Sequence, residues 1–275
     1  MMKVVIPGSF YRQYDADYSR DVPAEGFQGW VTESVPVSLR HTALVVMHAW
    51  DCGKPGQYPG WRNNCEYHDR ADRICREVFP PLLAAVRQSP IPVIHVTMGG
   101  THYFREYAGY KKAVRLAESL PPENPPEQQA VDDPVSLELK DRYVGYPALL
   151  GKHNVEDIER GMRNVNFAPN TEPLGDEGIA EDGRQLSALC RHHGINHLLY
   201  TGFALNWCLL LSRGGMADMK PRGFLCSVVR DAVTAIENKE TARRELCKEV
   251  ALWRIGLAYG FVFFSGDIIN ALSKK

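Results

Sequence analysis

The sequence has 275 residues, of which 44% are apolar and 24% charged, and its formal net charge is −1. These values are typical of a globular protein with one large domain, and they give no electrostatic reason to expect nucleic acid or an anionic membrane as partner. A small-molecule substrate is therefore the expected ligand. No apolar run approaches the ~20 residues of a membrane span and the N-terminus lacks a signal-peptide pattern, so we expect a cytoplasmic protein.

The cysteines are odd in number and scattered, without a CxxC pair. Such a set argues against a disulfide framework and favours reduced thiols, of which one could be kept for its reactivity. They stand at positions 52, 65, 75, 190, 208, 226 and 247.

The first 40 residues show no clean period, and we interpret them as an ordered N-terminal extension that wraps the domain or a neighbouring subunit. A single α/β domain is expected over 41–275. Its first predicted elements are a strand Thr42–His48, a loop Asp51–Asn64, a helix of about Asp69–Gln88 that Pro80 and Pro81 kink or divide, and a strand Pro92–Met98.

The region of about 100–176 predicts a long irregular insertion. It includes short helices near 108–119 and at Asn154–Arg163, and a Pro- and acid-rich surface stretch over Pro121–Pro134. No internal repeat is present.

The remainder of the chain alternates between helices and strands. The predicted elements are a helix Asp182–His193 ended by Gly194, a strand 197–201, a helix from Asn206 to about Met219, a strand Gly223–Val229, a helix of about Thr241–Tyr259 and a strand Phe261–Phe264. This alternation predicts a mainly parallel, six-stranded, Rossmann-like sheet within a three-layer α/β/α sandwich.

Cys208 stands near the expected start of the helix that follows the strand 197–201. Gly202 lets the chain turn there, and Asn206 can cap the helix. The positive end of a helix dipole favours a thiolate, so Cys208 is a candidate nucleophile. The alternative is a buried core cysteine, because cysteine is among the most buried residue types.

The order of four segments is similar to that of the isochorismatase-like cysteine hydrolases, which include isochorismatases, nicotinamidases, N-carbamoylsarcosine amidases and ureidoacrylate hydrolases. The segments are Thr42–Val46, Pro92–Val96, His193–Cys208 and Arg230–Val233. The third is the most specific, since it resembles the strand, glycine turn, cysteine and helix of that family in one stretch.

The resemblance implies an isochorismatase-like fold, a homo-oligomer (dimer or tetramer) and hydrolysis of a small amide, ureido or vinyl-ether substrate. Cys208 takes the position of the nucleophile, which attacks the substrate carbon. An unusual cis peptide is implied at Phe203–Ala204, with the amides of Ala204 and Cys208 as oxyanion donors.

Two family residues are replaced. His48 stands where the family has its aspartate, and Asp51 follows three residues later. No lysine occurs between Lys152 and Lys220, where the family lysine is expected. The nearest cations, Arg160 and Arg163, do not substitute for lysine in orientation or proton transfer.

Three hypotheses follow. His48 and Cys208 form a catalytic dyad whose resting state is an imidazolium–thiolate pair, or the chain is a degenerate homologue that serves as a binding or assembly module. The third is a zinc-stabilised interaction protein with His48, Cys52, Cys65 and His68 as ligands. Asp51, His95 and His102 are looser metal candidates, by similarity to some nicotinamidases. We expect no metal and no cofactor.

Aromatic and polar residues near the carboxyl ends of the strands are candidates for the pocket, because ligands bind at that edge in open α/β folds. They are Trp50, Asp51, His102 and Trp207. Core or subunit-interface packing is the alternative for the aromatic members.

Overall fold

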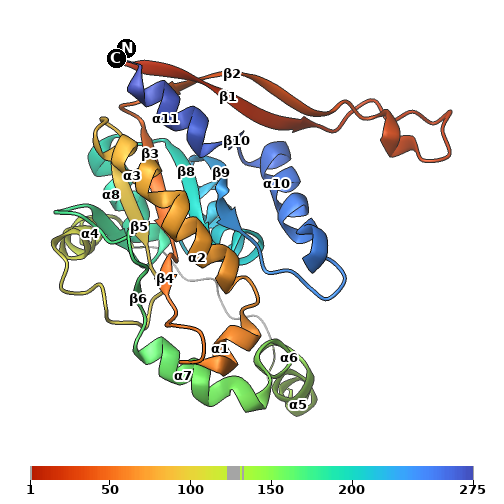
Figure 1. Cartoon of the computed structure of the whole chain (residues 1–275), viewed down its shortest axis with the longest axis vertical. Coiled ribbons are helices and arrows are strands. Elements are labelled where there is room, and N and C mark those ends of the chain that lie inside the picture. Colours follow the sequence, from red (N-terminus) through yellow and green to blue (C-terminus); the bar gives the residue numbers. More distant parts are fainter. Residues whose placement is uncertain (1, 123–130, 132, 275) are drawn as a thin grey trace.

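The computed structural model describes residues 2–122, 131 and 133–274, and it shows a twisted sheet with helices on both faces and a projecting arm (Figure 1). The strand order is β2-β1-β10-β9-β8-β3-β5-β7. The six strands from β10 to β7 are parallel, and β1 and β2 join their edge in antiparallel fashion. The predicted three-layer α/β architecture with six parallel strands is therefore present.

The strands are β1 (Lys3–Arg12), β2 (Gly29–Ser38), β3 (Thr42–Met47), β4 (Trp50–Asp51), β5 (Val93–Val96), β6 (Asn166–Phe167), β7 (Gly178–Ala180), β8 (His197–Phe203), β9 (Leu225–Thr234) and β10 (Val262–Phe263). The α-helices are α1 (Pro59–Asn64), α2 (His68–Glu77), α3 (Phe79–Arg87), α4 (Ala108–Glu118), α5 (Pro134–Tyr143), α6 (Tyr146–Leu150), α7 (Val155–Arg163), α8 (Gly183–His193), α9 (Met216–Met219), α10 (Leu246–Ala258) and α11 (Ser265–Ser273). Single turns of other helix types lie at Pro23–Gly26, Lys152–Asn154, Leu205–Leu209 and Ala242–Arg244.

The central strands are buried along their whole length. Every residue of β3, β5 and β8 is buried. Such continuous apolar runs are expected of parallel strands covered on both faces. One core forms between the sheet and α4, α8 and α10, and a second forms against α2, α3 and α11.

Strands β3 and β8 are adjacent, and their register places Met47 opposite Gly202. Gly202 has a φ of +109°, and a Cβ built there would lie 1.8 Å from the Met47 carbonyl oxygen. Only glycine fits this backbone. The close approach brings the ends of β3 and β8 together.

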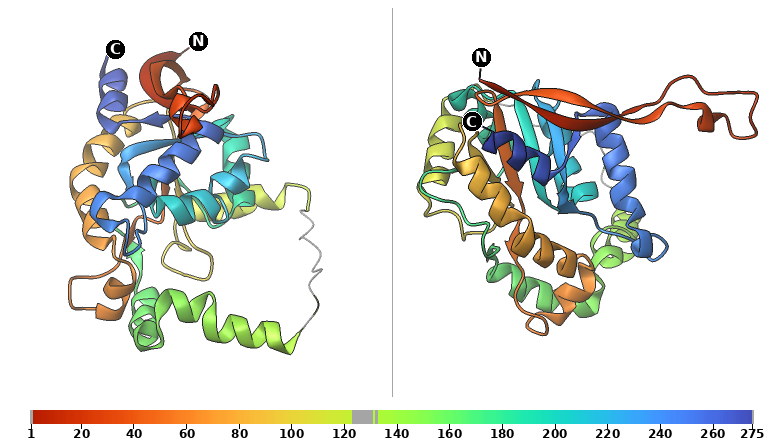
Figure 2. Two further views of the ribbon diagram at one scale, coloured as in Figure 1. Left: turned by 90° about the vertical axis from the view of Figure 1, so that its right-hand side faces the viewer. Right: turned by 45° about the horizontal axis from the view of Figure 1, so that its top comes forward.

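The N-terminal extension is a β-hairpin. Its ten residue pairs run from Lys3–Ser38 to Arg12–Gly29, and it joins the sheet through the pair Ser9–Val262. The arm extends beyond the body of the molecule (Figure 2). Most of β2 is exposed or half-buried, so its sequence lacks the alternation that would have predicted a strand.

Two predicted elements need correction near the site. The expected loop Asp51–Asn64 contains β4 and α1, because Trp61 of α1 packs on Gly161 of α7. The expected helix from Asn206 to Met219 is interrupted: a π-helical turn Leu205–Leu209 is followed by a break at 212–215 and then α9.

The remaining predictions agree with the structure in outline. The helix expected over Asp69–Gln88 is divided into α2 and α3 at Val78, next to the two prolines. In the insertion, α4 and α7 match the expected helices, while most of Pro121–Pro134 (123–130 and 132) lies outside the described residues. Across the described chain, no helix combines the length and apolar character that a bilayer crossing requires.

Candidate active site

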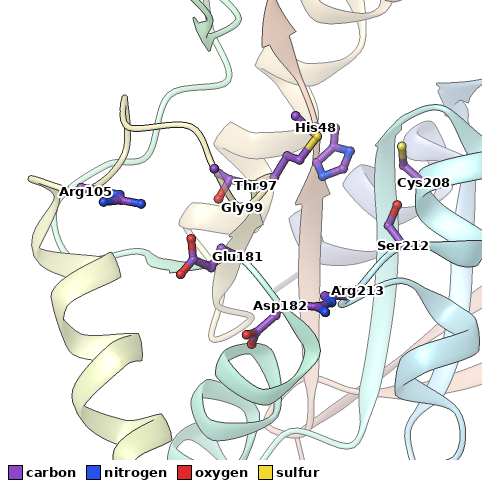
Figure 3. A pocket seen from close by; sticks show the side chains of 11 residues that line it. His48, Thr97, Gly99, Arg105, Glu181, Asp182, Cys208, Ser212 and Arg213 are labelled. Carbon is purple, nitrogen blue, oxygen red and sulfur yellow. The ribbon is translucent and has the colours of Figure 1, made fainter. Parts of the chain in front are cut away.

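An open pocket of about 620 Å³ lies at the carboxyl ends of the central strands (Figure 3). It contains the two residues for which the sequence predicts catalytic roles, Cys208 and His48. The complete lining is His48, Thr97, Met98, Gly99, Gly100, Arg105, Glu181, Asp182, Cys208, Ser212 and Arg213.

Three of the lining residues each lie directly after a strand of the sheet. His48, Thr97 and Glu181 are the first residues after β3, β5 and β7, which are neighbours in the sheet. Ala204 occupies the corresponding position after β8. Parallel strands end at one edge, so the sheet itself gathers these residues around the pocket.

Cys208 is placed by the π-helical turn Leu205–Leu209. Burial raises the pKa of its thiol, although hydrogen bonds from the Ser212 hydroxyl and the Ala204 backbone N–H lower it in part. Burial of Cys208 thus opposes the thiolate that a helix start is expected to favour. The turn is too short to supply a long helix's dipole, and burial outweighs the two donors.

Asn206 does not cap this turn. The residue at the N-cap position is Ala204, and no side chain there accepts a hydrogen bond. The peptide bond between Phe203 and Ala204 is cis, at the position that the resemblance implies.

His48 is 6% exposed and has a φ of +51°. Its ring stacks on Trp50, with centroids 4.6 Å apart and planes inclined by 21°. Burial lowers the pKa of His48 to about 4, against a smaller opposing effect of a hydrogen bond with the Thr97 backbone. Its Nδ1 is buried without a hydrogen-bond partner.

The protonation states of the pair differ from the expected imidazolium–thiolate. Burial favours the neutral forms of both Cys208 and His48. Among the hydrogen bonds of the described residues, none joins the two side chains directly, although both border the same pocket (Figure 3). The arrangement is thus a thiol and a neutral imidazole.

The opposite wall carries the pocket's carboxylates. Glu181 Oε1 accepts hydrogen bonds from the Tyr110 hydroxyl at 2.8 Å and from Gln185 Nε2 at 3.3 Å. Asp182 caps α8 through the Gln185 backbone N–H. Strands lie ~4.8 Å apart, so the end of β7 is roughly 14 Å from that of β8, too far for Glu181 to deprotonate Cys208 directly.

The pocket's cations are Arg105 and Arg213. Neither is among the cations considered from the sequence. Arg160 instead bonds to Asp157 at 2.9 Å on α7, and Arg163 lines a neighbouring cavity of about 640 Å³. Among the residues that the structure describes, no lysine lines the pocket.

The four pocket candidates are dispersed. Trp50 lies behind the His48 ring, and His102 lines the neighbouring cavity. Asp51 accepts a hydrogen bond from the Gly53 N–H at 2.9 Å, and Trp207 is 47% exposed. Neither Asp51 nor Trp207 is part of the pocket lining.

The proposed zinc ligands do not form a metal site. In the part of the chain that the structure describes, no group of three or more His, Cys, Asp or Glu side chains is arranged to hold a metal ion. His95, one of the looser candidates, instead bonds to Glu177 at 3.1 Å within the core. The zinc hypothesis has no geometric support.

Several lining residues were missed by the sequence analysis. Glu181 follows β7, a three-residue strand that was not predicted, and Thr97 lies inside the predicted strand Pro92–Met98. Ser212 lies one helical turn after Cys208, and that spacing could have drawn attention to it.

No protein-family model matches the chain, and no curated protein matches its sequence. Among solved structures, it is similar to a cysteine hydrolase from Pseudomonas syringae pv. phaseolicola 1448A, with 12% identity, coverage of 86% of this chain and 95% of that one, and a TM-score of 0.48. An isochorismatase from Pseudomonas putida KT2440 matches with 17% identity, 85% and 93% coverage, and a TM-score of 0.44. An isochorismatase-like hydrolase from Alkaliphilus metalliredigens matches with 15% identity, 85% and 99% coverage, and a TM-score of 0.46.

These structures carry the names of the group that the sequence resembles. Their identities to this chain are 12–17%, so the chemistry of the chain has to be judged from its own residues.

Proposed function

We propose that this chain is a cysteine hydrolase of the isochorismatase-like type, which acts on a small amide, ureido or vinyl-ether substrate through Cys208. The observation that supports this most is that Cys208 and His48 line one pocket. They follow the neighbouring strands β8 and β3. The backbone N–H of Ala204, which is directed at the Cys208 sulfur, adds to this support.

For an amide or ureido substrate, the Cys208 sulfur attacks the carbonyl carbon and its proton passes to the neutral His48 imidazole. The Ala204 N–H stabilises the oxyanion that forms beside the sulfur. His48 then gives the proton to the leaving amine as the carbon–nitrogen bond breaks. Water hydrolyses the thioester or thiocarbamate and restores the thiol.

Protonation of His48 accompanies the attack in this scheme. The resting pair is neutral, so the base form of His48 is available at neutral pH. Burial of both groups raises the cost of separating charge, and the Ala204 N–H donor lowers it.

The test is release of ammonia or amine from a panel of small amides and ureido compounds, with intact-mass detection of an adduct after exposure to chloroacetamide. We expect turnover and an adduct on Cys208, both lost in Cys208→Ser. Cys247→Ser, which removes another partly buried thiol, is the matched control and should retain both. Turnover that persists in Cys208→Ser would refute the proposal.

A second candidate is a degenerate homologue that binds a small molecule without cleaving it. It is favoured by the neutral state of Cys208 and by the lack of a lysine in the pocket lining. Saturable binding of a compound from the same panel, with no turnover and unchanged by Cys208→Ser, would select this function over hydrolysis.

A further inference from the structure

The end of the N-terminal arm, residues 13–28, forms no hydrogen bond or ion pair with the body of the molecule among the described residues; we call this segment the arm tip. Within the described chain, its hydrogen bonds all stay inside the hairpin, as in Asp17 N–H to Pro23 O and Tyr14 Oη to Gln28. It projects from the body in Figure 1 and in the right-hand view of Figure 2. An isolated two-stranded hairpin is at best marginally stable in water. The arm tip would therefore gain stability by packing on another surface.

The arm tip exposes both apolar and acidic side chains. Tyr14, Tyr18 and Val22 are 48%, 87% and 52% exposed. The tip has one basic residue, Arg20, and its acidic residues are Asp15, Asp17, Asp21 and Glu25. Such a segment fits an apolar groove with a basic rim.

A groove of that kind lies along α10; we call it the α10 groove. It has a volume of about 460 Å³ and is lined by Asn206, Leu210, Thr241, Leu246, Cys247, Val250, Ala251 and Arg254. Val250 is 56% exposed. Exposed Arg243 and Arg244 adjoin the lining in sequence, and within the described chain neither these two nor Arg254 forms an ion pair with an acidic side chain.

We propose that the arm tip of one copy docks in the α10 groove of a second copy. The base of the arm is held on its own α10, where Trp253 meets Tyr11 edge-to-face at 6.2 Å and Gly256 underlies Trp30. The arm continues beyond this contact, and its tip points away from the body (Figure 1).

Each copy carries one tip and one groove, so mutual docking closes as a two-fold dimer. In such a dimer each copy contributes its tip to one contact and its groove to the other. The acidic tip also matches in charge the three arginines beside the groove, Arg243, Arg244 and Arg254, which form no ion pair among the described residues.

The docked tip rests against the segment that carries Cys208. Asn206 and Leu210 line the α10 groove, and Cys208 between them lines the candidate active site. Dimer formation thus supports the outer side of the turn whose inner side holds the thiol.

Light scattering of the full chain after size-exclusion chromatography tests the dimer. We expect a mass at least twice 30.9 kDa. Residues 13–28 can be replaced by Asn-Gly, because Arg12 and Gly29 face each other and a two-residue turn can join them. This variant should have at most half the mass of the wild type. A monomeric wild type, or an unchanged mass without the tip, would overturn the proposal.

The groove is tested separately with the full-length arm. The proposal can then be tested even if the shortened arm causes a folding defect. Val250→Glu should dissociate the dimer, and Leu139→Glu, at an exposed leucine of α5, should not. A photoreactive benzoylphenylalanine in place of Tyr18 should cross-link to residues 241–254 of an isotope-labelled second copy. Cross-links confined to the other copy's arm would overturn the proposal.

Discussion

The Asn206 side chain is bonded at both ends to the backbone of Ile236. Its Nδ2 donates to the Ile236 carbonyl at 2.8 Å, and its Oδ1 accepts from the Ile236 N–H at 3.0 Å. The amide thereby ties the π-helical turn to the chain that follows β9. Because Cys208 is two residues further along this turn, the pair fixes where the thiol lies.

Asn206→Ala should remove both hydrogen bonds and leave two partly buried backbone groups unpaired, at a cost of about 2–4 kcal/mol in the free energy of unfolding. Asn206→Asp keeps the acceptor and loses the donor, so its loss should be smaller. Urea titration at pH 7 measures both. Equal losses in the two variants would show that the hydrogen bond from the Ile236 N–H, which Asp can still accept, contributes nothing.

The pH dependence of Cys208 alkylation should reflect its raised pKa. We expect the rate with iodoacetamide to rise with a midpoint above 9, the ordinary thiol value, because burial disfavours the thiolate. Ser212→Ala removes a hydrogen bond that lowers the pKa, so its midpoint should lie higher still. A midpoint below 7 in the wild type would restore the imidazolium–thiolate hypothesis.

His48→Gln should reduce kcat by about 10²- to 10⁴-fold if His48 is the base. Since its pKa is about 4, the imidazole is already neutral above pH 5, and wild-type activity should fall only as the pH drops through about 4. His102→Gln, in the neighbouring cavity, is the control and should leave kcat unchanged. An activity limb near pH 6.5 would contradict this assignment.

Acid should destabilise the fold through its buried histidines. Burial lowers the pKa of His48, His68 and His197 to about 4 each. Below pH 6.5 the unfolded chain binds protons that the folded chain excludes, so stability is complete above 6.5 and declines as the pH falls toward 4.

The loss is up to about 3 kcal/mol per histidine. Urea midpoints measured from pH 7 to pH 4.5 report it, and His68→Leu should flatten the decline. A midpoint that is constant over this range would be inconsistent with buried neutral histidines.

Gly202→Ala should prevent stable folding or cost more than about 3 kcal/mol, because a Cβ would overlap the Met47 carbonyl oxygen. Gly223→Ala is a matched control: its φ is also positive, at +93°, but a Cβ there meets nothing within 4 Å. Thermal unfolding should therefore separate the two variants. Similar melting temperatures would mean that β3 and β8 move apart at little cost.

The sequence predicts the central sheet well because β3, β5 and β8 are continuous apolar runs, and buried parallel strands need nothing else. Prolines mark the division between α2 and α3, and Gly194, in the left-handed conformation, ends α8 as expected. These signals are local, so one sequence suffices to find them.

Other features depend on contacts that a single sequence does not display. Three residues are too few for β7 to show a period, and with β7 the sequence also hides Glu181. Burial by distant segments favours the neutral forms of His48 and Cys208. The residues that flank them in the sequence do not reveal this burial.

The order of the strand ends gives the pocket a polarity. From β7 through β5 and β3 to β8, the first residues past the strands present a carboxylate, a hydroxyl, an imidazole and a backbone amide beside the thiol. A molecule lying across this edge meets the Glu181 carboxylate at one end and the Cys208 thiol at the other. The direction in which it enters, as much as its dimensions, decides which of its atoms faces Cys208.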